Sequence, residues 1–132
     1  MPLEYIGAST SASERMTRPY SPAVRAGDYI YVSGQVASNA QGEIVAGGIE
    51  VQTRQTMENL KAVLALANAT LEDVCKCTVW LADARDFRGF NRVYATYFCN
   101  ANPARSATEA RLVVDSKIEI EVIAFKPVSP RV

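Results

Sequence analysis

The segment PARSATEARLVVDSKIEIEVIAFKP, which runs from Pro103 to Pro127, decides the fold. Its second half alternates with the period of two that is typical of a β-strand. One side of that strand is apolar and the other is mixed: Ile118, Ile120 and Val122 form the first, whereas Glu119, Glu121, Ile123 and Phe125 share the second. We therefore predict a β-hairpin that turns around Val114 to Lys117, with one buried face and one face of mixed character.

Charged residues of the predicted hairpin face one another in pairs. The turn places Arg111 opposite Glu119, and the same register sets Glu109 near Glu121 and Arg105 near Phe125. A cross-strand ion pair at an exposed position stabilises a sheet by about 0.2–1 kcal/mol. We expect Arg111 and Glu121 to serve mainly in such pairs and in assembly.

Arg105 stands apart from these pairs. It lies at the start of its strand, just after Pro103, where a guanidinium can reach a cleft rather than a neighbouring side chain. The planar fork of arginine matches a small carboxylate in bidentate fashion. Spacing alone leaves two interpretations open, a carboxylate-binding arginine and an ordinary surface arginine.

Strand and helix patterns alternate along the rest of the chain. Strands are predicted at residues 28–34, at 43–46 as the hairpin partner of the first, and at 74–82, with a minor strand near 3–6. Residues 7–18 are predicted to form a surface loop, and the prolines that follow favour an extended path. A helix is predicted over 49–68, and a second helix follows the N-cap Asp83 with one aromatic stripe, formed by Phe87, Phe90, Tyr94, Tyr97 and Phe98.

Each predicted helix has a single apolar stripe, so both are expected to cover the same face of one sheet in a two-layer α+β domain. At the end of the first helix, Asn68 is expected to adopt a left-handed conformation, and Thr70 with Asp73 to cap one further turn. The chain has 132 residues and is 48% hydrophobic, which suits one domain.

The sheet face without helices is expected to be a subunit interface. It presents a mixture of large amphipathic and charged side chains: Tyr29, Tyr31, Lys76, Thr78, Trp80, Arg111, Glu119 and Glu121. This mixed face is too polar for a core and too aromatic for an idle surface. We predict a homo-oligomer in which the mixed face is turned inward.

Charge and residue usage exclude several functional classes. Lys plus Arg equals Asp plus Glu at 14 each, so no overall charge favours nucleic acid or an anionic membrane. The start lacks a secretion signal and no long apolar run is present, so a soluble, cytoplasmic protein is expected. The chain has no histidine, and Cys75 and Cys77 are expected to point together into the core. Neither a metal nor an organic cofactor is expected.

The chain resembles the RidA/YjgF family of enamine/imine deaminases over nearly its whole length. Three segments carry the resemblance, in the same order as in the family: PYSPAVRAGDYIYVSGQV, QTMENLKAVLALANATLEDVCKCTVWLADARDF and PARSATEARLVVDSKIEIEVIA. The resemblance implies one RidA-like domain over residues 1–132 with a chorismate-mutase-like α+β fold. It also implies a homotrimer with sites in clefts between neighbouring subunits. The implied activity is hydrolysis of 2-imino acids such as 2-iminopropanoate and 2-iminobutanoate to 2-keto acids and ammonia.

Site residues follow from the same resemblance. The family's carboxylate-binding arginine matches Arg105 and its acidic residue matches Glu119, while Tyr20, Gly34 and Asn91 match further site positions. Arg105, Glu119 and Tyr20 would be catalytic, and Gly34, Asn91 and Ala107 would line the substrate site. Ala107 stands where well-known members often have cysteine, and Val113 replaces a customary proline. The first departure excludes a mechanism that depends on that thiol.

The sequence is also compatible with two other functions. The same cleft could bind keto acids or other small carboxylates without turnover, and Ala107 leaves room for that hypothesis. A deaminase for a longer enamine acid, of the aminoacrylate or aminomuconate type, is a related alternative. Ribonuclease activity has been attached to relatives, but the balanced charge and the lack of histidine and of a basic aromatic stripe argue against it.

Overall fold

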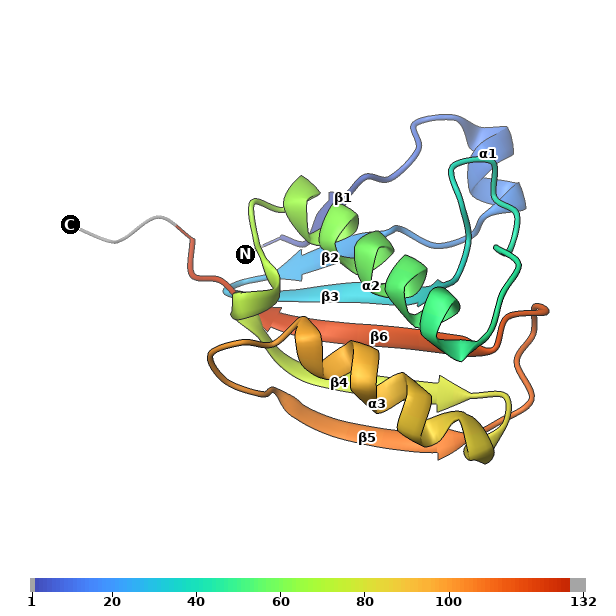
Figure 1. The fold of residues 1–132 in the computed structure, drawn as a ribbon. Coiled ribbons are helices and arrows are strands. Elements are labelled where there is room, and N and C mark those ends of the chain that lie inside the picture. Colours follow the sequence, from blue (N-terminus) through green and yellow to red (C-terminus); the bar gives the residue numbers. More distant parts are fainter. Residues whose placement is uncertain (1, 129–132) are drawn as a thin grey trace.

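The computed structural model describes residues 2–128, which form a six-stranded sheet with two long helices packed on one face (Figure 1). The strands are β1 (Glu4–Ile6), β2 (Ala23–Ala26), β3 (Tyr29–Val36), β4 (Val74–Leu81), β5 (Ala104–Glu109) and β6 (Ile118–Phe125). The α-helices are α1 (Ala12–Thr17), α2 (Ile49–Leu66) and α3 (Phe87–Thr96), and the short 3₁₀ turns η1 (Leu71–Asp73) and η2 (Ala84–Asp86) flank β4.

The sheet has the strand order β1-β2-β3-β6-β4-β5, and β5 is an edge strand. All neighbours are antiparallel except β4 and β5, which run parallel. The long helices α2 and α3 cover the same face of the sheet in Figure 1. The predicted two-layer α+β architecture with two helices on one face is therefore confirmed.

The core lies between this sheet face and the two long helices. Alternation along β6 buries every second side chain, and α2 contributes side chains at helical spacing. The fully buried side chains of the core include Ile118, Ile120, Met57, Leu60, Leu64 and Phe90. Apolar burial stabilises the fold by about 25 cal/mol per Å². The strands β4 and β6 therefore turn their apolar faces toward the helices, and their other faces point away from them.

The predicted hairpin over 103–127 is wrong, because β4 lies between β5 and β6. The aromatic stripe of α3 packs back on the sheet between β4 and β5, and a strand-helix-strand unit of this kind leaves its two strands parallel. The segment 110–117 crosses the end of β4 instead of forming a tight turn. Glu119 consequently pairs with Val36 and Trp80, and the predicted pairings of Arg111, Glu109 and Arg105 do not form.

Two predictions for the first half of the chain are also wrong. The hairpin partner of β3 is β2 and not residues 43–46, which contribute only an isolated bridge between Ser38 and Ile44. A two-residue loop joins β2 to β3, with Gly27 at φ 62° in its first position, which is where type II′ hairpins use glycine. In the predicted loop 7–18, Ser11 accepts a hydrogen bond from the Glu14 N–H and begins α1.

The end of α2 agrees with the prediction. Asn68 has φ 57°, in the left-handed region. Thr70 and Asp73 form a reciprocal capping box at η1, in which each side chain accepts a hydrogen bond from the backbone. The chain can therefore turn sharply from α2 into β4.

Replacing Thr70 with alanine is expected to lower the free energy of unfolding by about 1 kcal/mol, because an orphaned N–H loses its cap. Urea denaturation measures this change. Thr10→Ala is the matched control, since Thr10 is exposed and outside every helix, and it should change the free energy by less than about 0.5 kcal/mol. Equal losses in the two variants would contradict a specific role for the cap.

Candidate functional site

Arg105 lies under α3 on the edge strand β5. It is in register with Cys77 of β4, which is fully buried, so the Arg105 side chain is directed to the helix side of the sheet. There its Nη1 donates a hydrogen bond to Oδ1 of Asn91 at 2.8 Å. The structure thus brings together two predicted site residues that belong to different elements, α3 and β5.

Three aromatic rings of α3 surround the same guanidinium. Its Cζ lies 5.4 Å from the ring centroid of Phe87, 5.3 Å from that of Phe90 and 5.0 Å from that of Tyr94. These distances fall within the range of cation–π attraction. The sequence predicted this stripe only as helix packing, and the signal that was missed is the parallel arrangement of β4 and β5, which places α3 above Arg105.

Among residues 2–128, the Arg105 guanidinium forms no ion pair with an Asp or Glu. A half-buried arginine without a carboxylate partner keeps its charge and most of its N–H donors available. Ala107 lies two residues further along β5, on the same side of the strand, and its small side chain is exposed. The charge and the available donors at this edge of the sheet suit a small anion.

Glu119 lies on the opposite face of the sheet, the mixed face. It is half-buried and pairs with Trp80 of β4 and Val36 of β3. Burial, with a smaller contribution from the negative charge of Glu121, raises the pKa of Glu119. A carboxyl group with a raised pKa can exchange a proton with a reacting group closer to neutral pH.

Gly34 is in direct contact with Glu119. A β-bulge between Val32 and Gln35 shifts the register of β3 against β6. A Cβ atom built on Gly34 would lie 3.0 Å from Cδ of Glu119 and would overlap its carboxylate oxygen. Only glycine allows the carboxylate to rest against the backbone here.

Gly34→Ala is expected to reduce the activity proposed below by roughly 10-fold to 100-fold, because the new methyl group displaces the Glu119 carboxylate. The end of a glutamate side chain can move, so the fold should persist, and circular dichroism should be unchanged. Gly48→Ala is the control, since nothing lies within 4 Å of its Cβ position. Wild-type activity in Gly34→Ala would show that Gly34 is not part of the site.

Tyr20 occupies a loop beside β3 and is 63% exposed. Ser33 fixes this loop: its N–H donates to the carbonyl of Pro22 at 3.0 Å and its hydroxyl donates to the carbonyl of Ser21 at 2.6 Å. Tyr20 also lines an open cavity of about 1460 Å³ between the N-terminal segment and residues 35–44. The backbone that follows Tyr20 is therefore anchored to β3 at Ser33, and the Tyr20 ring itself is largely exposed.

A single copy of the chain does not bring all the predicted site residues together. Arg105, Asn91 and Ala107 lie on the helix side of the sheet or at its edge, whereas Glu119 points to the mixed face. The sheet therefore lies between Arg105 and Glu119 within one copy of the chain.

The mixed face is present as predicted, apart from Arg111. Tyr29 and Tyr31 are exposed, Trp80 is half-buried, and the Tyr29 ring packs edge-on against Phe125 with centroids 5.2 Å apart. Large aromatic side chains and charges thus share one broad, uncovered sheet surface, which is the composition expected of an interface.

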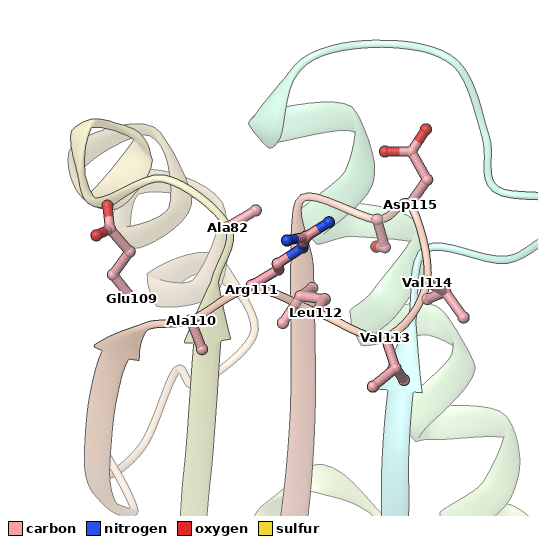
Figure 2. A pocket seen from close by; sticks show the side chains of 9 residues that line it. Ala82, Glu109, Ala110, Arg111, Leu112, Val113, Val114 and Asp115 are labelled. Atoms are coloured by element: carbon pink, nitrogen blue, oxygen red, sulfur yellow. The ribbon is translucent and has the colours of Figure 1, made fainter.

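Arg111 lies in the segment that crosses beyond the ends of β4 and β6, and it lines a shallow cavity of about 730 Å³ (Figure 2). Figure 2 shows its side chain and that of Asp115 on one side of this segment, with Val113 on the other. Val113 is 96% exposed. The prediction that Arg111 pairs with Glu119 on the mixed face is wrong, because Arg111 follows β5 and lies outside the sheet.

Cysteine placement differs in part from the prediction. Cys77 is buried, but Cys75 is exposed because a register shift between Val74 and Lys76 turns it outward. Within the described residues, no three Cys, Asp or Glu side chains gather as a possible metal site. Across residues 2–128, none of the helices combines the length and apolar character needed to cross a bilayer.

Comparison with known proteins identifies the family. The family model described as endoribonuclease L-PSP matches residues 11–126. A RutC family protein of Pyrococcus horikoshii is 50% identical over 110 residues, covering 82% of this chain and 87% of the relative. The mouse 2-iminobutanoate/2-iminopropanoate deaminase is 41% identical over 120 residues, covering 89% of each chain.

A solved structure agrees with these sequence relationships. The crystal structure of Escherichia coli TdcF with bound serine superposes with a TM-score of 0.77 at 37% identity, covering 82% of this chain and 88% of that one. The fold, the matched length and the identities all point the same way. The chain belongs to the endoribonuclease L-PSP family, which is the RidA/YjgF family.

Proposed function

We propose that the protein is a deaminase that hydrolyses small 2-imino acids, such as 2-iminopropanoate and 2-iminobutanoate, to 2-keto acids and ammonia. The observation that carries this proposal is the Arg105 guanidinium, which is held by Asn91 and aromatic rings and has no carboxylate partner among residues 2–128. Relatives named as 2-iminobutanoate/2-iminopropanoate deaminases support the substrate class.

The proposed site lies between subunits of a homotrimer. Arg105, Asn91 and Ala107 of one protomer would face Glu119, Gly34 and Tyr20 of its neighbour, since the sheet separates these groups within one protomer. The uncovered aromatic surface of the mixed face supports contact with a second copy. Cross-linking and light scattering test the number of subunits.

The proposed chemistry needs little beyond orientation, because an imine next to a carboxylate is already electrophilic at C2. Arg105 grips the carboxylate, and Glu119 of the neighbour holds the attacking water and accepts its proton. Water adds to C2, the nitrogen receives protons and leaves as ammonia, and the carbonyl of the 2-keto acid remains. Tyr20 closes the cleft, and Gly34 leaves space for the Glu119 carboxylate.

A coupled assay tests the proposal directly. A pyridoxal-phosphate dehydratase generates the imine, and semicarbazide competes with the protein for it. The protein is expected to suppress semicarbazone formation in proportion to its concentration. No acceleration of keto acid release would reject the deaminase proposal.

A second candidate function is binding of small carboxylates without turnover. The bound serine in the TdcF structure favours it, because serine is a small carboxylate and that protein is a relative. Calorimetric binding of a 2-keto acid together with no acceleration in the coupled assay would select this function. Cleavage of RNA by the purified protein would instead support the activity in the family description.

A further inference from the structure

We propose that Phe87, Phe90 and Tyr94 are positioning residues, whose aromatic rings hold the Arg105 guanidinium in place for a ligand carboxylate and occupy none of its N–H donors. The inference rests on the proposed function, since it concerns how that site recognises its ligand. It adds to the site three side chains of α3 that are not expected to touch the reacting atoms.

The three rings form one continuous surface. Phe87 and Phe90 have centroids 6.2 Å apart, and Phe90 and Tyr94 have centroids 5.1 Å apart. They recur at helical spacing along α3, so the helix presents them together toward β5. The Arg105 Cζ lies 5.0 to 5.4 Å from all three centroids. One guanidinium is therefore packed against a whole helix face.

Aromatic rings can hold the Arg105 guanidinium without blocking its N–H donors, whereas a protein carboxylate cannot. An Asp or Glu beside Arg105 would fix the guanidinium but occupy the fork that a ligand carboxylate needs. Ring faces attract the cation through their quadrupole and take no N–H donor. Asn91 accepts a single hydrogen bond and sets the rotation of the group. The remaining donors stay available for a substrate.

The three rings differ in how deeply they are buried. This difference allows a role in core packing to be distinguished from a role in positioning Arg105. Phe90 is fully buried and Tyr94 nearly so, whereas Phe87 is 39% exposed at the start of α3. Loss of the Phe87 ring should therefore disturb the guanidinium more than the core. The guanidinium is held on its outer side by this half-exposed ring.

Only the ring of Tyr94 is required by this arrangement, not its hydroxyl group. Its Oη atom is buried, and its polar neighbour is the weakly hydrogen-bonding thiol of Cys77, with no stronger partner among residues 2–128. Burial raises the pKa of Tyr94, so the phenol stays neutral. Phenylalanine should replace it without loss of positioning.

The test compares ring-removing and ring-preserving variants of the whole chain. Phe87→Leu is expected to raise both the Kd for pyruvate and the KM for 2-iminobutanoate by roughly twofold to fivefold, with kcat nearly unchanged. Phe87→Tyr and Tyr94→Phe should match the wild type. Phe98→Leu is the control, because Phe98 packs against Tyr94 with centroids 4.9 Å apart but is not among the rings near Arg105.

Nuclear magnetic resonance gives a readout without turnover. Ring currents should shift the Arg105 side-chain protons upfield in the wild type, and the shift should shrink in Phe87→Leu but not in Phe98→Leu. Equal Kd, KM and shifts in all variants would overturn the inference even if the deaminase activity is present. Ring-dependent pyruvate binding without deamination would instead uphold the inference and reject the proposed reaction.

Discussion

Arg105→Ala is expected to lower kcat/KM for 2-iminobutanoate by roughly 10²–10³-fold while leaving the oligomer intact. Removing one partner of a buried, hydrogen-bonded charge pair costs about 2–5 kcal/mol, and each 1.4 kcal/mol is about tenfold. In the proposed site Arg105 is the group that grips the substrate carboxylate. The coupled dehydratase assay measures the loss.

The fold should tolerate this change. Arg105 lies on the edge strand, is only half-buried and pairs with no carboxylate among residues 2–128. Its removal therefore strands no buried negative charge. Thermal unfolding should show a modest loss of stability, because the contacts with Asn91 and the rings of α3 are removed, and light scattering should resemble that of the wild type.

Two further arginine variants separate charge from geometry. Arg105→Lys keeps the positive charge but loses the planar fork, so its kcat/KM should lie between those of the wild type and Arg105→Ala. Arg88→Ala removes an equal charge from an exposed position of α3 and should retain activity. Full activity in Arg105→Ala would refute the site assignment.

The sequence predicted the parts of the fold that depend on local pattern. Alternation in residues 118–125 and helical spacing in α2 each repeat over several turns or residue pairs, and both elements are present. Asn68 and Thr70 were correctly predicted because helix ends and caps depend on neighbouring residues. These features need no information about distant segments.

The sequence did not predict which strands are neighbours. Local pattern gives the existence of β5 and β6, but pairing is decided by α3, whose packing against the sheet brings β5 beside β4. Two bulges, near Cys75 and Gly34, likewise depend on the partner strand and not on local preference. The contact between Arg105 and the rings of α3 is a consequence of this arrangement.

The residues chosen by resemblance met two different outcomes. Arg105 and Asn91 form a hydrogen bond, which position in the sequence alone did not indicate. Glu119 and Gly34 touch one another but lie across the sheet from Arg105. How the two groups join in one site stays a prediction, since it depends on a second copy of the chain.

Glu119→Gln is expected to reduce kcat by roughly 10²–10⁴-fold, because glutamine cannot accept the proton of the attacking water. The loss should fall on kcat more than on KM, since Arg105 still binds the carboxylate. Glu43→Gln is the control, because Glu43 is an exposed carboxylate outside the site. Retained turnover in Glu119→Gln would show that another group activates the water.

The same variant should change stability in a pH-dependent way. Burial raises the pKa of Glu119 above its ordinary value of 4.5. The folded state therefore holds this proton more strongly than the unfolded state, and stability is lost as pH rises through the raised pKa. Glu119→Gln should thus be more stable than the wild type at pH 7 and similar to it below about pH 4.5. Urea denaturation at both pH values measures the difference.

Glu121 offers a way to move this titration without touching Glu119. Its negative charge is the second cause of the raised pKa, after burial, so Glu121→Gln should lower the pKa of Glu119. If Glu119 must be ionised to activate water, the acidic limb of the kcat/KM profile should shift to lower pH in Glu121→Gln. Replacing Glu121 removes its repulsion of the Glu119 carboxylate, so the titration of Glu119 must move. An acidic limb that does not shift would therefore show that the limb reports the titration of another group.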